Sequence, residues 1–458
     1  MKKYIFFALF LLGLGGVYAL NMGGVNSSKD LSLSLDVNPS TYKPIASGPV
    51  VIRGVTLLDG LGGRMANVDI LLEAGQIKSI GKQIEAPEKT IEINGTGRYI
   101  TPGLIDVHTH LGTASLPYTT GDVSNWDVNE ETNALTPHVR AEHAISPQDP
   151  SFIAALAGGV TTFQVLPGSS NLIGGLGVVM ENVPASTPQA MKFPDAPYGL
   201  KMACGENPKS YGDKNMAPSS RMGNVALQRQ AWIDAQIYDE EYRAGKRSRD
   251  LGLETLVAVL RGDVNVHVHC YRADDMATMI DMAHEFDFKI TAFHHAVEAY
   301  KITELLREND ICSVVWSDWW GFKLEAFDGI QENAAFLEAA KACAVIHSDL
   351  PVIGQMLVME TAKALAAGRK AGLSLSKAEA LRWITINPAK LLGIEDKVGS
   401  LEVGKNADVV LWSGDPFSVY SRVDQVFIDG AVVYDRNDAD FIPVSDMLTG
   451  QAALEKQL

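Results

Sequence analysis

Two histidines one residue apart follow a short apolar run early in the chain. Residues 104–107 come directly after a Pro-Gly pair and are typical of a buried strand, which ends in His108-Thr109-His110. Because side chains alternate across a strand, His108 and His110 point to one side and Thr109 to the other. Two imidazoles on one face can bind a single metal ion, and the open end of a rigid strand is where such a site needs its ligands.

Further histidines and one aspartate also stand where apolar runs end. These residues are His267 and His269, His294 and His295, and His347 with Asp349. Several such exits in chain order predict that the side chains meet at one end of a barrel of parallel strands. Imidazoles together with a carboxylate suit Zn²⁺ or a similar divalent ion.

The central part of the chain alternates strand-like and helical patterns. Candidate strands are 160–166, 199–203, 264–270, 288–294, 311–316 and 344–347, and helical spacing covers 273–286, 297–309, 333–342 and 356–371. This alternation is typical of βα units around a parallel sheet. Eight units would close a barrel with its chemistry at the carboxyl ends of the strands, and most of the eight can be placed.

Short alternating segments with turn residues lie at both ends of the chain. They cover 50–58, 68–73, 76–80 and 89–93, and then 409–412, 423–429 and 431–434. We therefore expect a strand-rich domain built from 49–100 and 396–436, a barrel over 101–395 and a C-terminal tail over 437–458.

The overall charge and the first residues indicate where the protein acts and on what. A net charge of −16 in 458 residues argues against nucleic acid and favours a small molecule or a dipeptide as partner. Residues 1–19 join Lys2-Lys3 to an apolar run and a small-x-small end, which predicts a signal peptide before a linker over 20–48. We expect a periplasmic or secreted protein without a stable membrane span, since the apolar run is shorter than the roughly 20 residues of a span. A homo-oligomer is compatible with the sequence.

Four cysteines are widely spaced and lie in apolar runs. They are Cys204, Cys270, Cys312 and Cys343. The spacing shows no disulfide framework and favours buried free thiols, although an exported protein could pair some of them.

Six short motifs are spread over most of the chain. They are Thr101-Pro102-Gly103-Leu104-Ile105-Asp106-Val107-His108-Thr109-His110, Gly159-Val160-Thr161-Thr162, Asn387-Pro388-Ala389, Val403-Gly404-Lys405-Asn406-Ala407-Asp408, Gly414-Asp415-Pro416 and Asp429-Gly430. In this combination the sequence resembles the amidohydrolase superfamily from about residue 50 to about residue 435, and it is most similar to the imidazolonepropionase-like and prolidase-like branch. The resemblance implies an α/β fold: a distorted (β/α)₈ TIM barrel with a small β-sandwich domain formed from both ends of the chain.

The resemblance also implies a set of metal ligands. His108 and His110 would hold one ion, His269 and His295 a second, and Asp349 would complete the site. His269 keeps the family's spacing to the segment 272–275, and His295 keeps it to 298–299. The neighbours left open as alternatives are His267 and His294.

A bridging ligand is expected from a middle strand, where the family often carries a carboxylated lysine and sometimes a glutamate. Lys201 is the first candidate and Glu206 the second. Two divalent ions, for which Zn²⁺ is the expected metal, would lie about 3.5–4 Å apart and activate a hydroxide. Asp349 could act as general base and then as general acid, with His347 orienting its neighbours.

Two loops and a tryptophan cluster are candidates for substrate binding. The loop 166–175 offers Ser169 and Asn171, and the loop 205–209 offers Glu206 and Lys209. Other candidates are Arg221, Arg272, His347 and a pocket wall of Trp316, Trp319 and Trp320.

These features predict an exported, metal-dependent amidohydrolase that cleaves an amide, peptide or cyclic amide C–N bond. One alternative is a deaminase with a single metal, but that class carries His-x-x-Glu where residues 269–272 read His-Cys-Tyr-Arg. The other is a catalytically silent binding protein on the same barrel, because fold does not fix function. The complete ligand set argues against the silent protein.

Overall fold

The computed structural model describes residues 35–116 and 126–438. The predicted signal peptide (1–19), the first part of the predicted linker (20–48) and nearly all of the predicted tail (437–458) lie outside the described residues. Within the described ranges, no helix combines the length and the apolar character needed to cross a membrane.

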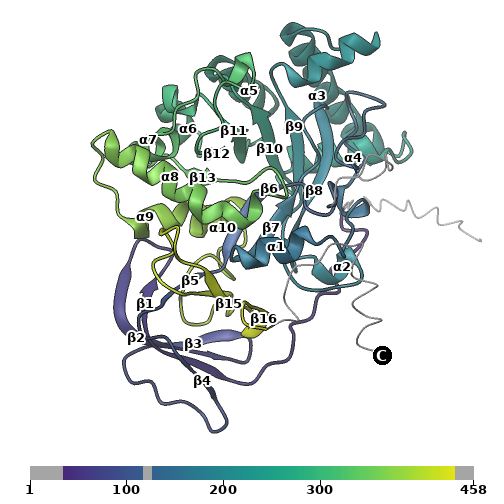
Figure 1. The fold of residues 1–458 in the computed structure, drawn as a ribbon. Helices are drawn as coiled ribbons and strands as arrows, with labels where there is room; N and C mark the ends of the chain where they lie inside the picture. The colour runs from purple at the N-terminus through teal and green to yellow at the C-terminus, as the bar shows by residue number, and fades with distance from the viewer. Residues whose placement is uncertain (1–34, 117–125, 439–458) are drawn as a thin grey trace, which may run out of the picture. The chain divides into compact units, whose positions relative to one another are not determined.

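Eight strands form the barrel sheet (Figure 1). They are β6 (Leu104–Thr109), β7 (Val160–Val165), β8 (Ile173–Glu181), β9 (Gly199–Ala203), β10 (Asn265–Cys270), β11 (Ala292–His295), β12 (Cys312–Val315) and β13 (Ala344–Ile346). Neighbouring strands follow chain order from β6 to β13. The two outermost strands are linked near their carboxyl ends, where the Asp349 amide donates to the His108 carbonyl at 3.0 Å. The prediction of an α/β fold with a distorted (β/α)₈ barrel is confirmed.

Strand β8 is where the barrel departs from a regular one, since it runs antiparallel to both β7 and β9. The connection from β7 spans only 166–172, whereas a parallel pair needs a crossover of a dozen or more residues. The prediction of one loop over 166–175 is therefore wrong at its end, because residues 173–175 belong to β8. Glycines in the strand weaken its pattern, since glycine is depleted in strands.

Helices cover the barrel sheet (Figure 1). They are α1 (Ser151–Ala157), α2 (Pro188–Met191), α3 (Arg221–Arg243), α4 (Leu251–Leu260), α5 (Ala273–Phe286), α6 (Thr303–Glu308), α7 (Asn333–Ala339), α8 (Leu357–Lys370), α9 (Lys377–Leu381) and α10 (Ile386–Leu392). The predicted helix over 297–309 is wrong in its first half, where Ala299–Lys301 form a 3₁₀ turn and only α6 is α-helical. The cause lies upstream, because the chain leaves β11 through positive φ angles at His295 and Ala296 and cannot start a helix at once.

A second sheet joins the two ends of the chain, as predicted. Its strands are β1 (Val50–Leu58), β2 (Arg64–Glu73), β3 (Gln76–Gly81), β4 (Ile91–Asn94), β5 (Tyr99–Pro102), β14 (Val409–Trp412), β15 (Val423–Ile428) and β16 (Ala431–Asp435). Strand β5 lies between β1 and β14, so N-terminal and C-terminal strands share one sheet. Alternating apolar residues from both ends therefore bury a common core.

Gly103 couples this sheet to the first barrel strand, because it is the only residue between β5 and β6. Its amide donates to the Asp408 carbonyl at 2.8 Å. A Cβ at this position would lie 2.0 Å from Thr161 Oγ1, so a larger residue would push β6 away from β7. The sheet thus anchors the strand that carries His108 and His110.

The described part of the predicted linker is held against the rest of the chain. Lys192 Nζ lies 2.6 Å from Asp36 Oδ1 and donates to the Asn38 carbonyl at 2.9 Å. Farther along, the Tyr42 hydroxyl donates to Asp429 Oδ2 at 2.6 Å. Residues 35–48 therefore pack on the folded protein although they contain almost no regular structure.

The expectation of free thiols is wrong, because all four cysteines are paired. Cys204 bonds to Cys270 and Cys312 to Cys343, with Cα separations of 5.2 Å and 4.6 Å. Cys270 and Cys312 lie in β10 and β12, whereas Cys204 directly follows β9 and Cys343 directly precedes β13. Each bond therefore links neighbouring strands of the sheet, whose separation suits a disulfide. The pairs lie 66 and 31 residues apart in the sequence, which is why spacing alone did not reveal them.

Candidate metal centre

The end of β6 and the residue Asp349 form the first cluster of ligand atoms. Asp349 Oδ1 lies 3.4 Å from His108 Nε2 and 3.5 Å from His110 Nε2. His110 turns its other nitrogen, Nδ1, to the Leu166 carbonyl at 2.9 Å. That bond orients the ring and leaves Nε2 free for a ligand, as is usual for histidines that bind metals.

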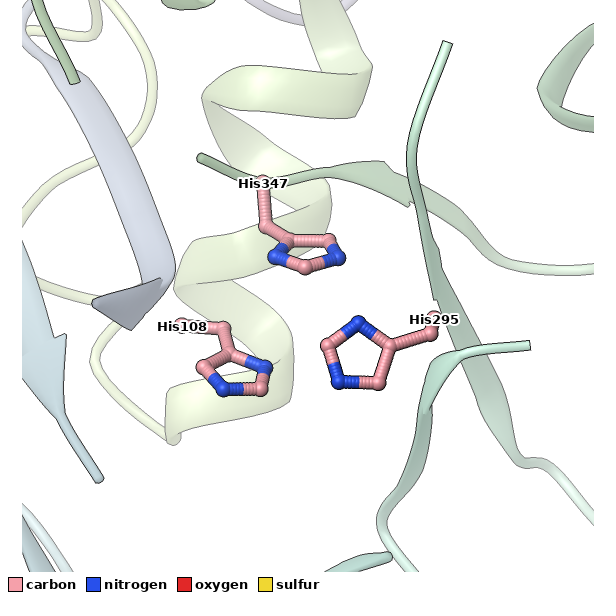
Figure 2. Close-up of side chains that lie close together, drawn as sticks. All are labelled: His108, His295 and His347. Carbon is pink, nitrogen blue, oxygen red and sulfur yellow. The ribbon is translucent and has the colours of Figure 1, made fainter. Parts of the chain in front are cut away.

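A second cluster shares His108 with the first one. His108, His295 and His347 each offer a ring nitrogen, and these atoms lie within 4.8 Å of one another. Figure 2 shows the three rings facing a common space from different strand ends. The spacing is compatible with a second cation beside the first, and His347, expected to orient its neighbours, is placed among the candidate ligands.

His269 lies next to this second cluster, with its ring centre 4.6 Å from that of His295. Both ring nitrogens of His269 and of His347, and Nδ1 of His295, are buried without a hydrogen-bond partner in the described part of the chain. Buried polar atoms are rarely left without a partner. Three imidazoles with orphaned nitrogens, each able to give one nitrogen to an ion, fit the donor set of a divalent cation.

His267 and His294, the neighbours that the sequence left open as alternative ligands, differ from His269 and His295 because they contact other polar side chains. His267 Nδ1 lies 2.9 Å from His294 Nε2, and His294 Nδ1 lies 3.0 Å from His108 Nδ1. At the far end, His267 Nε2 lies 3.4 Å from the Gln164 amide. A Cβ at Gly199 would come within 2.7 Å of the His267 ring, so glycine makes room for this row. We call the side chains of His108, His294 and His267, together with the Gln164 amide, the imidazole row.

The imidazole row has one consistent assignment of protons. If His108 uses Nε2 as a ligand, its Nδ1–H donates to His294, which donates to His267. His267 then donates to the amide oxygen of Gln164, whose oxygen and nitrogen positions are interchangeable in such a structure. His267 and His294 thus satisfy each other, whereas His269 and His295 keep nitrogens free.

Lys201 reaches the same space from β9. Its side chain is fully buried, and Nζ lies 3.3 Å from His108 Nε2 and 2.9 Å from the Pro167 carbonyl. Burial lowers its pKa to about 7, because an apolar surrounding disfavours the charged amine. The second bridging candidate, Glu206, pairs instead with Lys323 at 3.3 Å. The geometry favours Lys201.

Burial also keeps six histidines of the site uncharged. It lowers the pKa of His267 to about 3 and of His347 to about 4, and holds the values of His108, His269, His294 and His295 well below normal. Neutral imidazole is the form that binds metals. For Asp349, burial alone would raise the pKa, but the hydrogen bond and the charge of His110 outweigh burial and lower it. The carboxylate is therefore ionised at neutral pH.

Two site residues adopt a backbone conformation that non-glycine residues rarely take. His295 and Asp349 both have φ of 67°, in the left-handed region. Such strain costs of order 1–3 kcal/mol and persists where the surrounding structure enforces it, often at functional sites. Each residue ends or follows a barrel strand, and the turn there aims its side chain into the cluster.

The residues predicted in the loop 166–175 serve the loop itself. Asn171 is buried, and its Nδ2 donates to the carbonyls of Glu130 and Asn133 at 2.6 and 2.8 Å and to Thr136 Oγ1 at 3.1 Å. Its amide group therefore holds the insertion that follows β6. Ser169 is half-buried in the same loop.

The other predicted substrate residues lie farther out. Glu206 and Lys209 line an open hollow of about 730 Å³. Arg272 forms a two-pronged pair with Asp274 at 2.9 and 2.7 Å near the surface, so its guanidinium is already engaged. Arg221 is likewise engaged, by Asp275 and Glu325. Of the predicted tryptophans, Trp316 does contact the candidate metal centre, because its ring stacks on that of His295 with centres 4.2 Å apart.

Comparisons with known proteins agree with this architecture. The model of the amidohydrolase family matches residues 328–433. Amidohydrolase tasK of Hapsidospora irregularis is 33% identical over 399 residues, which are 80% of this chain and 40% of that protein's length. A dihydroorotase of Ligilactobacillus salivarius (strain UCC118) is 24% identical over 450 residues, covering 82% of this chain and 97% of that protein.

One solved structure is similar over nearly the whole described chain. The crystal structure of an amidohydrolase from Thermotoga maritima MSB8 superimposes with a TM-score of 0.77 at 35% identity, covering 84% of this chain and 100% of that one.

Proposed function

Because the chain belongs to the amidohydrolase family, we propose that it is a metal-dependent hydrolase of a C–N bond in a small-molecule amide, a dipeptide or a cyclic amide. The observation that carries the proposal is the pair of ligand clusters that share His108. Fold and family alone would not be enough, because one barrel hosts many functions. The donor atoms at the strand ends are what select hydrolytic metal chemistry.

We assign the ligands by the resemblance to the family, because free nitrogens alone do not separate His347 from His269 and His295. His108, His110 and Asp349 hold a first divalent ion, and His269 and His295 hold a second, for which Zn²⁺ suits the imidazole and carboxylate donors. The ring of His347 stacks on that of His108 with centres 4.9 Å apart and orients it.

Lys201 is the proposed bridge between the ions. Its lowered pKa supports this role, because only the neutral amine can add CO₂ and become a carboxylate donor. Its Nζ also lies beside His108 Nε2, where the two clusters meet.

Asp349 is the proposed proton carrier of the reaction. Such ions, when bound, polarise the scissile carbonyl and lower the pKa of the attacking water. Asp349 takes the proton from that water and passes it to the leaving nitrogen. Its carboxylate is ionised at neutral pH and lies within reach of both His108 and His110, so it stands where the water must approach.

The direct test is a screen of N-blocked amino acids, dipeptides and cyclic amides with metal-loaded protein. We expect amine release from an N-blocked amino acid or a dipeptide, or ring opening of a cyclic amide, with complete loss on chelation and recovery when a divalent metal is added back. Release of ammonia from an amino-purine or a similar ring would favour the deaminase instead. Tight binding without turnover would favour the silent binding protein.

The imidazole row is expected to tune metal affinity. Replacing His294 with leucine removes the acceptor of the His108 Nδ1–H bond, and lost partners of this kind typically weaken metal binding by 10–100-fold. We expect that loss in a competition titration with a chromogenic chelator, and partial recovery in His294→Gln, which keeps an acceptor. The exposed His284, which contacts Asn309, supplies the control His284→Leu. Equal affinities in all three variants would exclude the tuning role.

We further propose that the protein is exported to the periplasm or beyond the cell. The charged and apolar pattern of residues 1–19 supports a secretory signal. The two disulfides support it independently, because such bonds persist in oxidising compartments and are rare in the cytosol of mesophiles.

Export predicts a mature chain that starts near Leu20. Intact-mass analysis of protein from the native compartment should show this start and no alkylated cysteine before reduction, with four alkylated cysteines afterwards. Residues 1–19 still present on membrane-derived protein would show an anchor instead. Free thiols before reduction would remove the support that the two disulfides give to export.

A further inference from the structure

A cavity of about 360 Å³ opens beside the proposed second metal ion. His295 belongs both to the candidate metal centre and to the cavity wall, so the two spaces adjoin at this side chain. The rest of the wall includes Trp316, Trp319, Ile330 and Asn333. The volume is within the range of small-ligand sites.

The wall is built of flat aromatic surfaces. The rings of Trp316 and Trp319 are stacked with centres 4.8 Å apart and planes 14° apart, and Trp316 stacks in turn on His295. Trp316 is buried, Trp319 is half-buried and Trp320 is exposed at the rim. An aromatic ring or a branched aliphatic group of a substrate would pack against these ring faces, beside the metal centre.

The charges around the cavity disfavour an acidic group. No lysine or arginine lines it among the described residues, and the carboxylate in its wall belongs to Asp318. Lys363 lies 2.9 Å from Asp318 and 2.7 Å from Glu360, so its charge is already balanced. An anionic substituent would enter without a counter-charge.

Two wall groups still have an open hydrogen bond. Trp316 Nε1 and Asn333 Oδ1 are buried without a partner among the described residues. The orientation of Asn333 is certain, because its Nδ2 donates to the carbonyls of Ala296 and Val297 at 3.0 and 3.2 Å. Both atoms are shielded from solvent, so the wall offers a ligand the ring faces rather than these polar atoms.

We propose that this cavity is a substrate subsite for an uncharged aromatic or large aliphatic side chain, which packs against the faces of Trp316 and Trp319. The substrate class is then N-acylated amino acids or dipeptides that carry such a side chain on one side of the scissile bond. The proposed substrate class rests on the hydrolase function proposed above. The preference for an uncharged apolar group rests on the cavity alone.

The kinetic test compares substrates that differ in one side chain. N-acetyl amino acids and both orders of alanine dipeptides with phenylalanine, leucine, glycine, glutamate and lysine are compared by kcat/KM. We expect phenylalanine and leucine to exceed glycine and glutamate at least tenfold, as apolar pockets achieve. Trp319→Ala should lower the phenylalanine-to-glycine ratio about tenfold, mainly through KM, and Ile330→Lys should raise glutamate relative to phenylalanine. A preference for lysine or glutamate in the unaltered protein overturns the proposal.

A binding test decides the question even if no amide is cleaved. Calorimetry of the metal-loaded protein with 3-phenylpropan-1-ol, and with 1-propanol for comparison, should show saturable binding of the phenyl compound alone. Trp319→Ala should weaken it at least tenfold, whereas Tyr420→Ala, at a site 90% exposed in the other sheet's loops, should not. Equal binding to both variants overturns the subsite. Binding without hydrolysis keeps the subsite and refutes the proposed function.

Discussion

Replacing Asp349 with asparagine should lower kcat by 10²–10⁴-fold while both metal ions stay bound. The change preserves size and one ligand oxygen but removes the group that accepts the proton of the attacking water, and loss of a general base typically has this effect. Because His110 lowers the pKa of Asp349, the carboxylate is in its basic form throughout the neutral range. A large loss is therefore expected at every pH near 7.

The measurement is kcat and metal content of Asp349→Asn across pH, on the best amide from the screen. The control is Asp310→Asn, since Asp310 is 88% exposed and contacts Lys289 far from the centre. If Asp349→Asn keeps its metal and more than about a tenth of the turnover, the proton-carrier role is wrong. If it loses metal, kcat must be compared at saturating metal before a role is assigned.

Replacing Lys201 with alanine should reduce the metal content from two ions to one per chain and abolish most of the activity. Lys201 is the only lysine among the described candidate ligands, and its Nζ lies 3.3 Å from His108 Nε2. Loss of the bridge removes the second ion, and with it the second half of the clamp on the reacting oxygens.

Elemental analysis of the purified variants gives the metal count, and circular dichroism confirms that each is folded. Lys201→Glu should recover part of the second ion, because a carboxylate again bridges. Lys289→Ala, at a side chain 65% exposed, should bind as the unaltered protein does. Two ions in Lys201→Ala would refute the bridge, and one ion in the unaltered protein would refute the pair.

The residues at the strand ends were predictable because strand geometry is local. Alternation put His108 and His110 on one face, and the structure brings both to Asp349. The family resemblance then singled out Lys201, and the structure places it beside His108. The barrel and the sheet built from both chain ends were predictable for the same reason, because the repeat of apolar residues that indicates a strand or a helix spans only a few residues.

The choice between neighbouring histidines was not a local matter. His267 and His269 are two residues apart and share a strand face, so alternation cannot separate them. His294 and His295 are adjacent, and a regular strand would point only one inward. The positive φ of His295 turns it inward as well, and both rings contact His108.

Sequence alone therefore determined most of the barrel strands, the residue types at the strand ends and the family resemblance, because each depends on periodicity or on a short motif. Tertiary structure decided which nitrogens remain free. His108 meets Lys201 across 93 residues and His294 across 186, and the disulfides join cysteines across 66 and 31. It also decided the direction of β8, which follows from a connection too short for a parallel crossover. Such contacts depend on how distant segments meet, and no local pattern records that.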